Sequence, residues 1–223
     1  MFVGHFGLGL AAKRAAPEVS LGTLILACQL ADILWPTFVL LGIESFEIRP
    51  GITAVTPLDF THYPWSHSLV ALIAWGVIFA LAYRVARPSA PRTTLAVLAL
   101  LVVSHWVLDF VVHRPDLPLT PFSNARYGLG LWNSMPATLA VELPIFAAGV
   151  AIYATTTAAR DRIGAWAWWS LVAFLSIVYF MNLFGPPPPG IGAVAWVTES
   201  GWLLVLWGWW IDRHRVPRKL AAP

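Results

Sequence analysis

Residues 93–113 read TTLAVLALLVVSHWVLDFVVH, a largely apolar run that carries two histidines and one aspartate. At about 1.5 Å per residue, a helix of this length crosses roughly 30 Å, the thickness of the hydrocarbon core of a bilayer. Other runs of sufficient or nearly sufficient length lie at residues 20–43, 66–86, 135–157, 164–184 and 191–211. The chain is therefore predicted to be an all-α, polytopic membrane helix bundle with about six transmembrane helices.

The composition supports this class. Of 223 residues, 58% are hydrophobic and only 11% are charged, and the mean hydropathy is +0.71. Such a chain has too few polar groups to cover a soluble globule. The net charge of +3 comes from basic residues in short pieces between apolar runs, which argues against a nucleic-acid partner. A single cysteine, Cys28, provides neither a disulfide framework nor a cysteine metal motif.

The first residues form a shorter apolar segment, 1–12, which reaches only about 18 Å as a helix. It is expected to be a half-spanning, re-entrant or interfacial helix. Its basic residues follow the apolar part, and no cleavage pattern is visible, so we expect it to stay in the mature protein. No repeat or separate soluble region interrupts the chain, and residues 1–223 are predicted to be one integral membrane domain.

The basic residues predict the orientation. Eleven of the fourteen fall on alternate connections: Lys13, Arg14, Arg84, Arg87, Arg92, Arg160, Arg162, Arg213, Arg215, Arg218 and Lys219. The other three are Arg49, Arg114 and Arg126. By the positive-inside rule, the basic loops and the C-terminal tail are expected in the cytoplasm. The loops at 44–65, 114–134 and 185–190 are then expected to face outward.

Ionisable residues lie within the predicted spans. A charge in hydrocarbon costs at least ~2.5–3.5 kcal/mol on insertion scales, so each such group needs a partner or a water-filled pocket. Counted from the presumed outer helix ends, six of them fall in the outer half of the bilayer: Asp32, His67, His105, Asp109, Glu142 and Glu199. Their common depth predicts a shared site that faces the outer side.

The most specific local pattern is SHWVLDFVVH. His105, Asp109 and His113 stand at positions i, i+4 and i+8, on one face of a helix. Two imidazoles and a carboxylate arranged in this way can bind a divalent metal. A buried hydrogen-bonded pair of His105 and Asp109 is the alternative. His113, nearest the surface, is expected to be a loop-edge or substrate-side group.

The second pattern is THYPWSHSL. Pro64 blocks helix continuation, and Ser66 is expected to cap the helix that carries His67 into the membrane. His67 could then meet Asp109, and we predict that it is a metal ligand. His62 remains in the loop, where it is either solvated or part of a substrate-binding rim.

Four further residues complete the candidate site. Asp32 has no charged neighbour in sequence and must find a metal or a histidine across helices. His5 rises about 12 Å from the basic flank of its segment, towards the depth of Asp32. Its alternative is an interfacial histidine. Glu142 and Glu199 are candidates for a general acid or base, for partners of the ligands, or for simple hydrogen bonding between helices.

At these residues the sequence resembles the YdjM-like family of bacterial inner-membrane proteins, which are regarded as metal-dependent hydrolases. The family shows an early histidine, a PDID-type motif, an HRGxTHS-type motif and an SHxxxD-type motif. The matching pieces are His5, Ala31 with Asp32, His62 with His67 and Ser68, and Ser104 with His105 and Asp109. The resemblance covers roughly the first 120 residues, and it implies a location in the bacterial inner membrane.

The sequence also departs from the family pattern. Leu34 stands where the second aspartate of the PDID motif would be, and Tyr63 replaces the arginine. One ligand and one anion contact are therefore missing. The stretch HRPDLPL, followed by GLGLWNS, resembles a subgroup feature and points to His113, Arg114 and Asp116 as substrate-binding residues at the rim of the site.

The family is in turn distantly similar to the zinc phospholipase C and single-strand nuclease group. In that group the aspartate of an HxxxD helix bridges two metals, and the N-terminal residues help to bind one of them. Carried over, one metal would be held by Asp32, His67, His105 and Asp109. His5 with Asp109 could hold a second metal. A later HxxxE or HxxxD pair for a third metal is missing.

The sequence thus predicts a membrane-embedded hydrolase with one or two divalent metals. Zinc is favoured because the candidate ligands are imidazoles and carboxylates without thiolates. A lipid or lipid-linked phosphoester is the expected substrate, since metal ions and Arg114 could neutralise a phosphoryl group near the head-group region. Glu142 or Glu199 would carry the proton.

Other functions stay open at this stage. Intramembrane acids and histidines also form relays in proton-coupled transporters, although no repeat of two halves is visible. A non-catalytic membrane subunit with a structural metal is a third alternative. Ser66, Ser68 and Ser104 lie beside histidines, but no nucleophile elbow or phosphate loop accompanies them. A homo-oligomer is compatible with the sequence.

Overall fold

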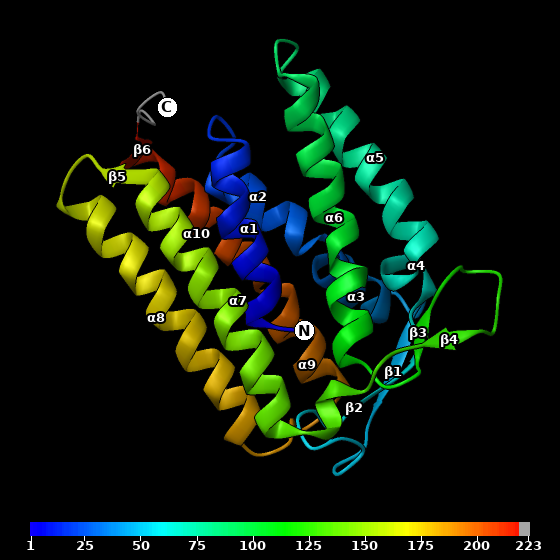
Figure 1. Cartoon of the computed structure of the whole chain (residues 1–223). Helices are drawn as coiled ribbons and strands as arrows, with labels where there is room; N and C mark the ends of the chain where they lie inside the picture. Colours follow the sequence, from blue (N-terminus) through cyan, green and yellow to red (C-terminus); the bar gives the residue numbers. More distant parts are fainter. Residues whose placement is uncertain (219–223) are drawn as a thin grey trace.

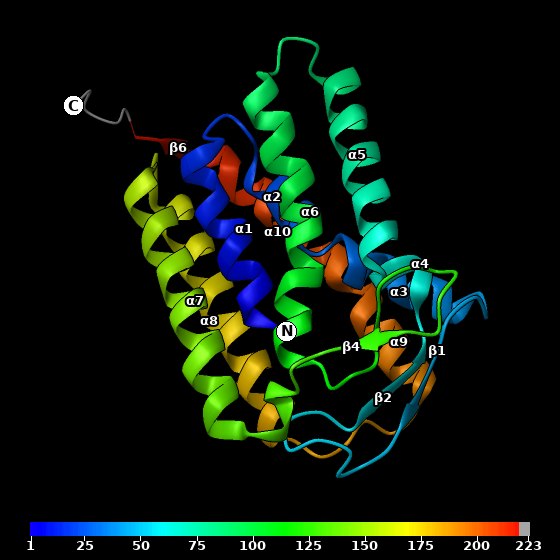
Figure 2. The same ribbon diagram turned by 45° about the vertical axis from the view of Figure 1, so that its right-hand side comes forward.

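The computed structural model of the chain describes residues 1–218, so the predicted cytoplasmic Lys219 lies outside the described residues. Figures 1 and 2 show a bundle of helices with short strands at both ends. The helices are α1 (Val3–Ala15), α2 (Leu21–Cys28), α3 (Leu30–Leu40), α4 (Pro64–His67), α5 (Leu69–Ala86), α6 (Arg92–Val112), the 3₁₀ helix η1 (Leu131–Asn133), α7 (Met135–Thr156), α8 (Arg162–Phe184), α9 (Ile191–Glu199) and α10 (Gly201–Arg213). The strands are β1 (Ser45–Ile48), β2 (Leu58–His62), β3 (Leu117–Pro118), β4 (Arg126–Tyr127), β5 (Thr157–Ala159) and β6 (Arg215–Pro217).

The predicted membrane bundle is confirmed. Within residues 1–218, five helical segments are long and apolar enough to cross a bilayer: α5, α6, α7, α8 and the α9 to α10 segment over Ile191–Arg213. The pair α2 and α3 counts as a sixth span if its bend is disregarded. The expected count of about six therefore agrees with the structure.

The predicted span over 20–43 is not one continuous helix: it breaks into α2 and α3 with a bend of 59°. The break falls at Gln29, whose backbone leaves the helical region with φ −107° and ψ 9°. The bend turns α3, with its intramembrane Asp32, into a direction that a continuous helix could not take. In sequence, QLAD contains neither glycine nor proline that would signal this break.

Helix α1 lies in the interior of the bundle, beside α7 and α6 in both ribbon views (Figures 1 and 2). Most of its residues, including His5 and Leu10, are buried. This burial excludes the interfacial alternative considered for residues 1–12. The backbones of α1 and α7 approach closely at Gly7 and Gly149, where a Cβ atom on Gly149 would stand 2.2 Å from the carbonyl oxygen of Gly7.

The end of the bundle with β1 to β4 is called here the loop end, comprising residues 44–63 and 114–134. The antiparallel pair β1 and β2 sets Phe46 opposite Phe60, and β3 pairs with β4. A small apolar cluster ties these strands to the helices through Trp35, Phe46, Tyr63 and Leu117. The sequence predicted only loops here, because the strands are short and interrupted.

At the opposite end, the carboxylate of Asp212 joins three elements. It accepts hydrogen bonds from the Lys13 ammonium at 3.3 Å, from the Tyr153 hydroxyl at 3.3 Å and from the backbone N–H of Leu21. Strands β5 and β6 pair just beyond it. This network fixes the chain entry into α2.

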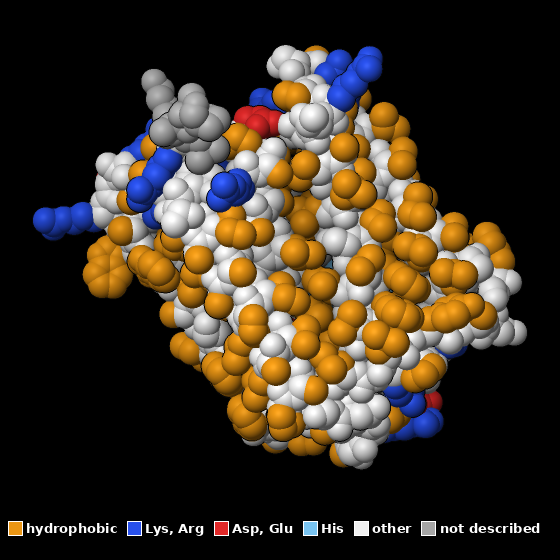
Figure 3. Space-filling view, viewed as in Figure 1, with side chains coloured by type: hydrophobic (Ala, Val, Ile, Leu, Met, Phe, Trp, Pro, Cys, Tyr) orange, Lys and Arg blue, Asp and Glu red, His pale blue; other side chains and the backbone are white. Residues whose placement is uncertain are grey.

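The surface suits a lipid environment. Figure 3 shows hydrophobic side chains over the middle of one face, whereas lysines and arginines gather near its upper and lower ends. Large apolar side chains within the spans are exposed, among them Val77, Leu100 and Ile177. Exposed apolar area of this extent is unfavourable in water but not against lipid tails.

Candidate metal centre

The structure brings together five side chains that the sequence singled out. They come from α1 (His5), α3 (Asp32), α4 (His67) and α6 (His105 and Asp109). Two groups have ligand atoms within 4.8 Å of one another: His5, His105 and Asp109, and Asp32, His67 and His105. We refer to these five residues as the His/Asp cluster. His105 belongs to both groups and stands at its centre.

The imidazole of His105 is oriented by the broken helix. Its Nδ1 lies 2.9 Å from the carbonyl oxygen of Cys28, the last residue of α2. A carbonyl only accepts, so Nδ1 carries the proton and donates it. The neutral ring then has a lone pair on Nε2, and this buried atom has no hydrogen-bond partner in the described part of the chain.

The imidazole of His67 is also held through its Nδ1 atom. Its Nδ1 lies 2.7 Å from the Ser66 hydroxyl, and that hydroxyl donates its proton to the carboxylate of Glu44 at 2.5 Å. The single hydroxyl proton is thereby used, so the Nδ1 of His67 donates to Ser66. The Nε2 of His67 again presents a lone pair to the cluster.

These lone pairs face carboxylate oxygens. The Nε2 of His105 lies 3.3 Å from Asp109 Oδ2 and 3.6 Å from Asp32 Oδ1. The Nε2 of His67 lies 3.4 Å from Asp32 Oδ1. Zinc binds imidazole nitrogen and carboxylate oxygen at about 2.0–2.2 Å in tetrahedral geometry, which sets ligand atoms roughly 3.4 Å apart. Asp32, His67 and His105 therefore fit a zinc-sized ion in donor chemistry, with their ligand atoms within 4.8 Å of one another, and Asp109 lies 3.3 Å from the shared His105.

Asp109 presents its two oxygens to different sides. Oδ1 lies 3.0 Å from the Nε2 of His5 and accepts a hydrogen bond from the amino group of Met1. Oδ2 faces His67 and His105 at 3.9 and 3.3 Å. The rings of His5 and His105 stack with their centroids 3.7 Å apart. A carboxylate in this position could bridge two ions.

His113 lies beside the cluster but in neither compact group. Its Nε2 is 3.8 Å from Asp109 Oδ2, and its Nδ1 is 2.9 Å from Asp116 Oδ1. Asp116 also accepts hydrogen bonds from the Tyr63 hydroxyl at 3.1 Å and from Arg114 at 3.0 Å. Burial, together with the nearby carboxylates of Asp116 and Asp109, holds the pKa of Tyr63 well above its usual value. Tyr63 therefore keeps its proton and remains a donor.

The predicted rim residues differ in their contacts with the cluster. Arg114 makes an ion pair with Asp59 in addition to Asp116, so its charge is already compensated. His62 is exposed at the end of β2. It contacts none of the cluster residues in the hydrogen bonds and ion pairs of residues 1–218.

The two predicted proton carriers are engaged elsewhere. The carboxylate of Glu142 accepts the backbone N–H groups of Phe2 at 2.9 Å and Gly4 at 3.4 Å. It therefore holds the start of α1, the helix that carries His5. Glu199 accepts a hydrogen bond from the Thr37 hydroxyl at 3.0 Å, a contact between α9 and α3. Hydrogen bonding between elements is the role that both contacts support.

Sequence reasoning missed Glu44 and misplaced a cap. Ser66 does not cap the helix that follows. Ser68 does, since its hydroxyl accepts the N–H of Ala71 at 3.2 Å. Glu44 accepts the N–H groups of Trp65 and Ser66 at 2.7 and 2.9 Å and is buried. A glutamate in the loop that follows α3 carries no sequence signal for this buried position.

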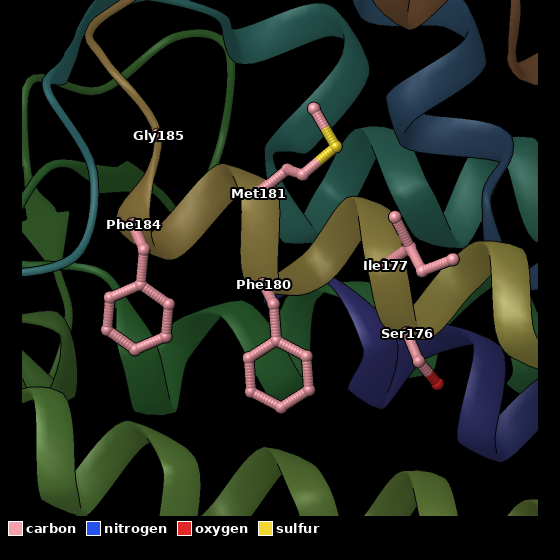
Figure 4. A pocket seen from close by; sticks show the side chains of 6 residues that line it. All are labelled: Ser176, Ile177, Phe180, Met181, Phe184 and Gly185. Atoms are coloured by element: carbon pink, nitrogen blue, oxygen red, sulfur yellow. The ribbon is translucent and has the colours of Figure 1, made fainter.

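One residue of the cluster is partly exposed on the surface of the protein. The side chain of Asp32 is 33% exposed, whereas those of the histidines and of Asp109 are buried. The apolar hollows of the surface lie elsewhere. One of about 510 Å³ runs along α8 and is lined by the residues labelled in Figure 4, none of which belongs to the cluster. A ligand for the cluster would therefore enter past Asp32.

Fold and site together define a polytopic membrane protein with a buried cluster of histidines and aspartates. The chain belongs to the YdjM inner membrane protein family, whose sequence model matches residues 1–185. This match extends beyond the first 120 residues in which the motifs were found. No match was found among curated proteins or among solved structures.

Proposed function

We propose that this protein is a membrane-embedded, metal-dependent hydrolase that acts on a lipid or lipid-linked phosphoester. The observation that carries the proposal is the orientation of His67 and His105, whose Nδ1 atoms are held by other partners while their Nε2 atoms face two carboxylates. Without a cation, lone pairs would oppose one another, and a buried unpaired acceptor costs about 1–3 kcal/mol. A divalent ion removes both penalties.

The residues divide the work as follows. Asp32, His67, His105 and Asp109 would hold a first ion, and His5 with Asp109 would hold a second. Zinc suits imidazole and carboxylate ligands, and a bound zinc ion lowers the pKa of water to about 7, so that water can attack at neutral pH. Because Asp32 is the partly exposed member of the cluster, water and substrate would approach on its side. Glu142 keeps His5 in place through α1.

The position of the cluster supports the substrate class. The cluster lies among helices long enough to span a bilayer, close to the loop end where β1 to β4 cover the bundle. A group at this depth can meet the head group of a lipid whose tails stay in hydrocarbon. Phosphoesters are favoured because metal ions stabilise the charge of a transferring phosphoryl group.

The test measures metal and activity together. Purified protein in detergent is freed of metal, re-equilibrated with zinc and assayed for bound zinc and for phosphate release from vesicles that contain phosphatidic acid. Wild type is expected to bind one or two zinc ions, and His105→Ala to lose zinc and activity. His214→Ala, at the opposite end of the bundle, is the matched control. A wild-type protein that binds no zinc would refute the proposal.

A proton-coupled transporter is the second candidate, favoured by one observation. The bend of 59° between α2 and α3 lies beside Asp32, and broken helices near intramembrane acids are typical of transporters. The two functions differ in a vesicle assay. A transporter would move protons or a solute across a sealed membrane, whereas the proposed hydrolase would release phosphate without a flux.

A structural metal in a non-catalytic subunit predicts a closed site with four protein ligands. The exposed part of Asp32 argues against it, because a solvent-reaching ligand leaves room for water. Retention of zinc without any hydrolysis of lipid phosphoesters would favour this third function.

A further inference from the structure

Four histidines turn their Nε2 atoms towards Asp109, and three of them, His67, His105 and His113, place Nδ1 against a different hydrogen-bond partner. His105 uses the carbonyl of Cys28, and His113 uses the carboxylate of Asp116. A carbonyl and an ionised carboxylate accept only, so Nδ1 is the donor in both contacts. The Tyr63 hydroxyl, 3.4 Å from the Nδ1 of His113, gives its own proton to Asp116. His67 is different, because its partner is a hydroxyl group.

The hydroxyl of Ser66 can either accept from His67 or donate to it. If it donated to Nδ1, a neutral His67 would carry its proton on Nε2, and a protonated nitrogen cannot bind a metal. The direction of one buried hydrogen bond thus decides whether His67 is a ligand. Something beyond Ser66 must set that direction.

Glu44 sets the direction of the hydrogen bond between Ser66 and His67. Its Oε2 accepts the Ser66 hydroxyl at 2.5 Å, and its Oε1 accepts the backbone N–H groups of Trp65 and Ser66. Both Glu44 and Ser66 are buried, so water does not compete for these bonds. With the hydroxyl proton committed to Glu44, the Ser66 oxygen is left to accept from His67.

The local fold brings Glu44 to this position. Helix α3 ends at Leu40, and Gly42 turns the chain with a left-handed φ of +72°. The next residues return towards α3, since the N–H groups of Ile43 and Glu44 both bond to the carbonyl of Phe38. Because Asp32 lies on the same α3, this turn joins the Asp32 element to the helix that carries His67.

We propose that Glu44, acting through the Ser66 hydroxyl, is a positioning residue that holds His67 in the metal-binding tautomer. The inference rests on the proposed function, because it assigns the orientation of one ligand of the proposed metal. It predicts a relay in which Glu44 accepts from Ser66, Ser66 accepts from Nδ1 of His67, and Nε2 points to Asp32 and Asp109. Partners of this kind typically change metal affinity by about 10- to 100-fold when they are removed.

Two substitutions separate the relay from the structural role of Glu44. Ser66→Ala removes the hydroxyl and leaves Glu44 on the N–H groups of Trp65 and residue 66. Glu44→Gln keeps an oxygen for those groups, but its amide donates to the Ser66 oxygen and frees the hydroxyl proton for Nδ1 of His67. Glu47→Gln, on the adjacent strand with an exposed carboxylate, is the matched control.

The first readout is zinc affinity of the full chain in detergent, measured by competition with a chelator. We expect about 10- to 100-fold weaker binding for Ser66→Ala and Glu44→Gln, and an unchanged affinity for Glu47→Gln. If the wild type binds zinc and Ser66→Ala binds it with equal affinity, the relay is overturned but the proposed function stands. A wild type that binds no zinc overturns both.

The second readout needs no metal, and its deciding measurement is made on the wild type. Nitrogen-15 spectra of histidine-labelled, zinc-free wild type report which ring nitrogen of His67 carries the proton, with His67→Gln assigning the signal. The relay predicts protonated Nδ1 and unprotonated Nε2 in wild type, and a shift towards protonated Nε2 in Glu44→Gln. Protonated Nε2 in the wild type would refute the inference.

Discussion

Replacing Asp32 by asparagine distinguishes a metal site from a cluster of buried ion pairs. In wild type, Asp32 Oδ1 faces the Nε2 atoms of His67 and His105 at 3.4 and 3.6 Å. If those atoms bear lone pairs, Asp32→Asn supplies an amide donor in place of a repelling oxygen. The zinc-free variant is then more stable than wild type, although it binds zinc less tightly.

The magnitude follows from the orphaned Nε2 of His105. Giving a buried, unpaired acceptor its donor stabilises the zinc-free protein by about 1–3 kcal/mol, or roughly 2–12 °C for a chain of this size. Zinc at 100 times the dissociation constant stabilises wild type by about 2.7 kcal/mol. A variant with 100-fold weaker affinity gains only about 0.4 kcal/mol under the same conditions.

The assay is thermal unfolding in detergent, followed by circular dichroism, with chelator or with zinc. We expect Asp32→Asn to unfold at a higher temperature than wild type in chelator and to respond less to zinc. If the two histidines were instead protonated partners of Asp32, the substitution would strand buried charge and cost about 3–5 kcal/mol. A variant that unfolds well below wild type in chelator would therefore refute the lone-pair reasoning.

Two further predictions concern the frame around the site. Gly149→Ala places a methyl group against the backbone of Gly7 and should destabilise the fold by about 1–3 kcal/mol. Gly192→Ala, with open space around it, serves as the control. Equal melting temperatures of the two variants would contradict the close packing of α1 against α7. At the opposite end, the hydrogen bond from His214 holds the pKa of Asp161 below its usual value, so its contribution to stability is present above about pH 4 and is lost as the pH falls below it. Carbon-13 titration should find that His214→Ala raises this pKa, and an unchanged value would contradict the assigned cause.

Much of the membrane architecture could be predicted from hydropathy. The runs containing α5, α6, α7 and α8 stand out because each is apolar over the full thickness of a bilayer. The bend at Gln29 could not be predicted, since it depends on tertiary contacts such as the one between the Cys28 carbonyl and His105. Hydropathy also gives no reason for α1 to be buried, because the close approach to α7 depends on two distant glycines.

The members of the His/Asp cluster could be found because intramembrane charge is costly and therefore rare. Asp32 and His105 stand out for that reason alone. Their orientation could not be found in the same way, since the hydrogen bonds of His105 to Cys28 and of His67 to Ser66 are set by the fold. Glu44 lies outside the apolar runs, where a glutamate is ordinary.

The role of Arg114, at the predicted rim of the site, could not be predicted from the sequence. The sequence predicted that Arg114 binds an anion. Asp59 on β2, 55 residues earlier in the chain, instead compensates the charge of Arg114. Such a pairing between two loops leaves no local pattern. The orientation of the chain in the membrane and the metal itself remain predictions.

If a cation lies between the imidazoles and carboxylates of α3, α4 and α6, anomalous diffraction at the zinc edge from crystals of zinc-loaded protein will locate it. We expect a peak within about 2.0–2.2 Å of Nε2 of His67, Nε2 of His105 and a carboxylate oxygen of Asp32 or Asp109. Zinc-loaded crystals with no peak among these atoms would contradict this expectation.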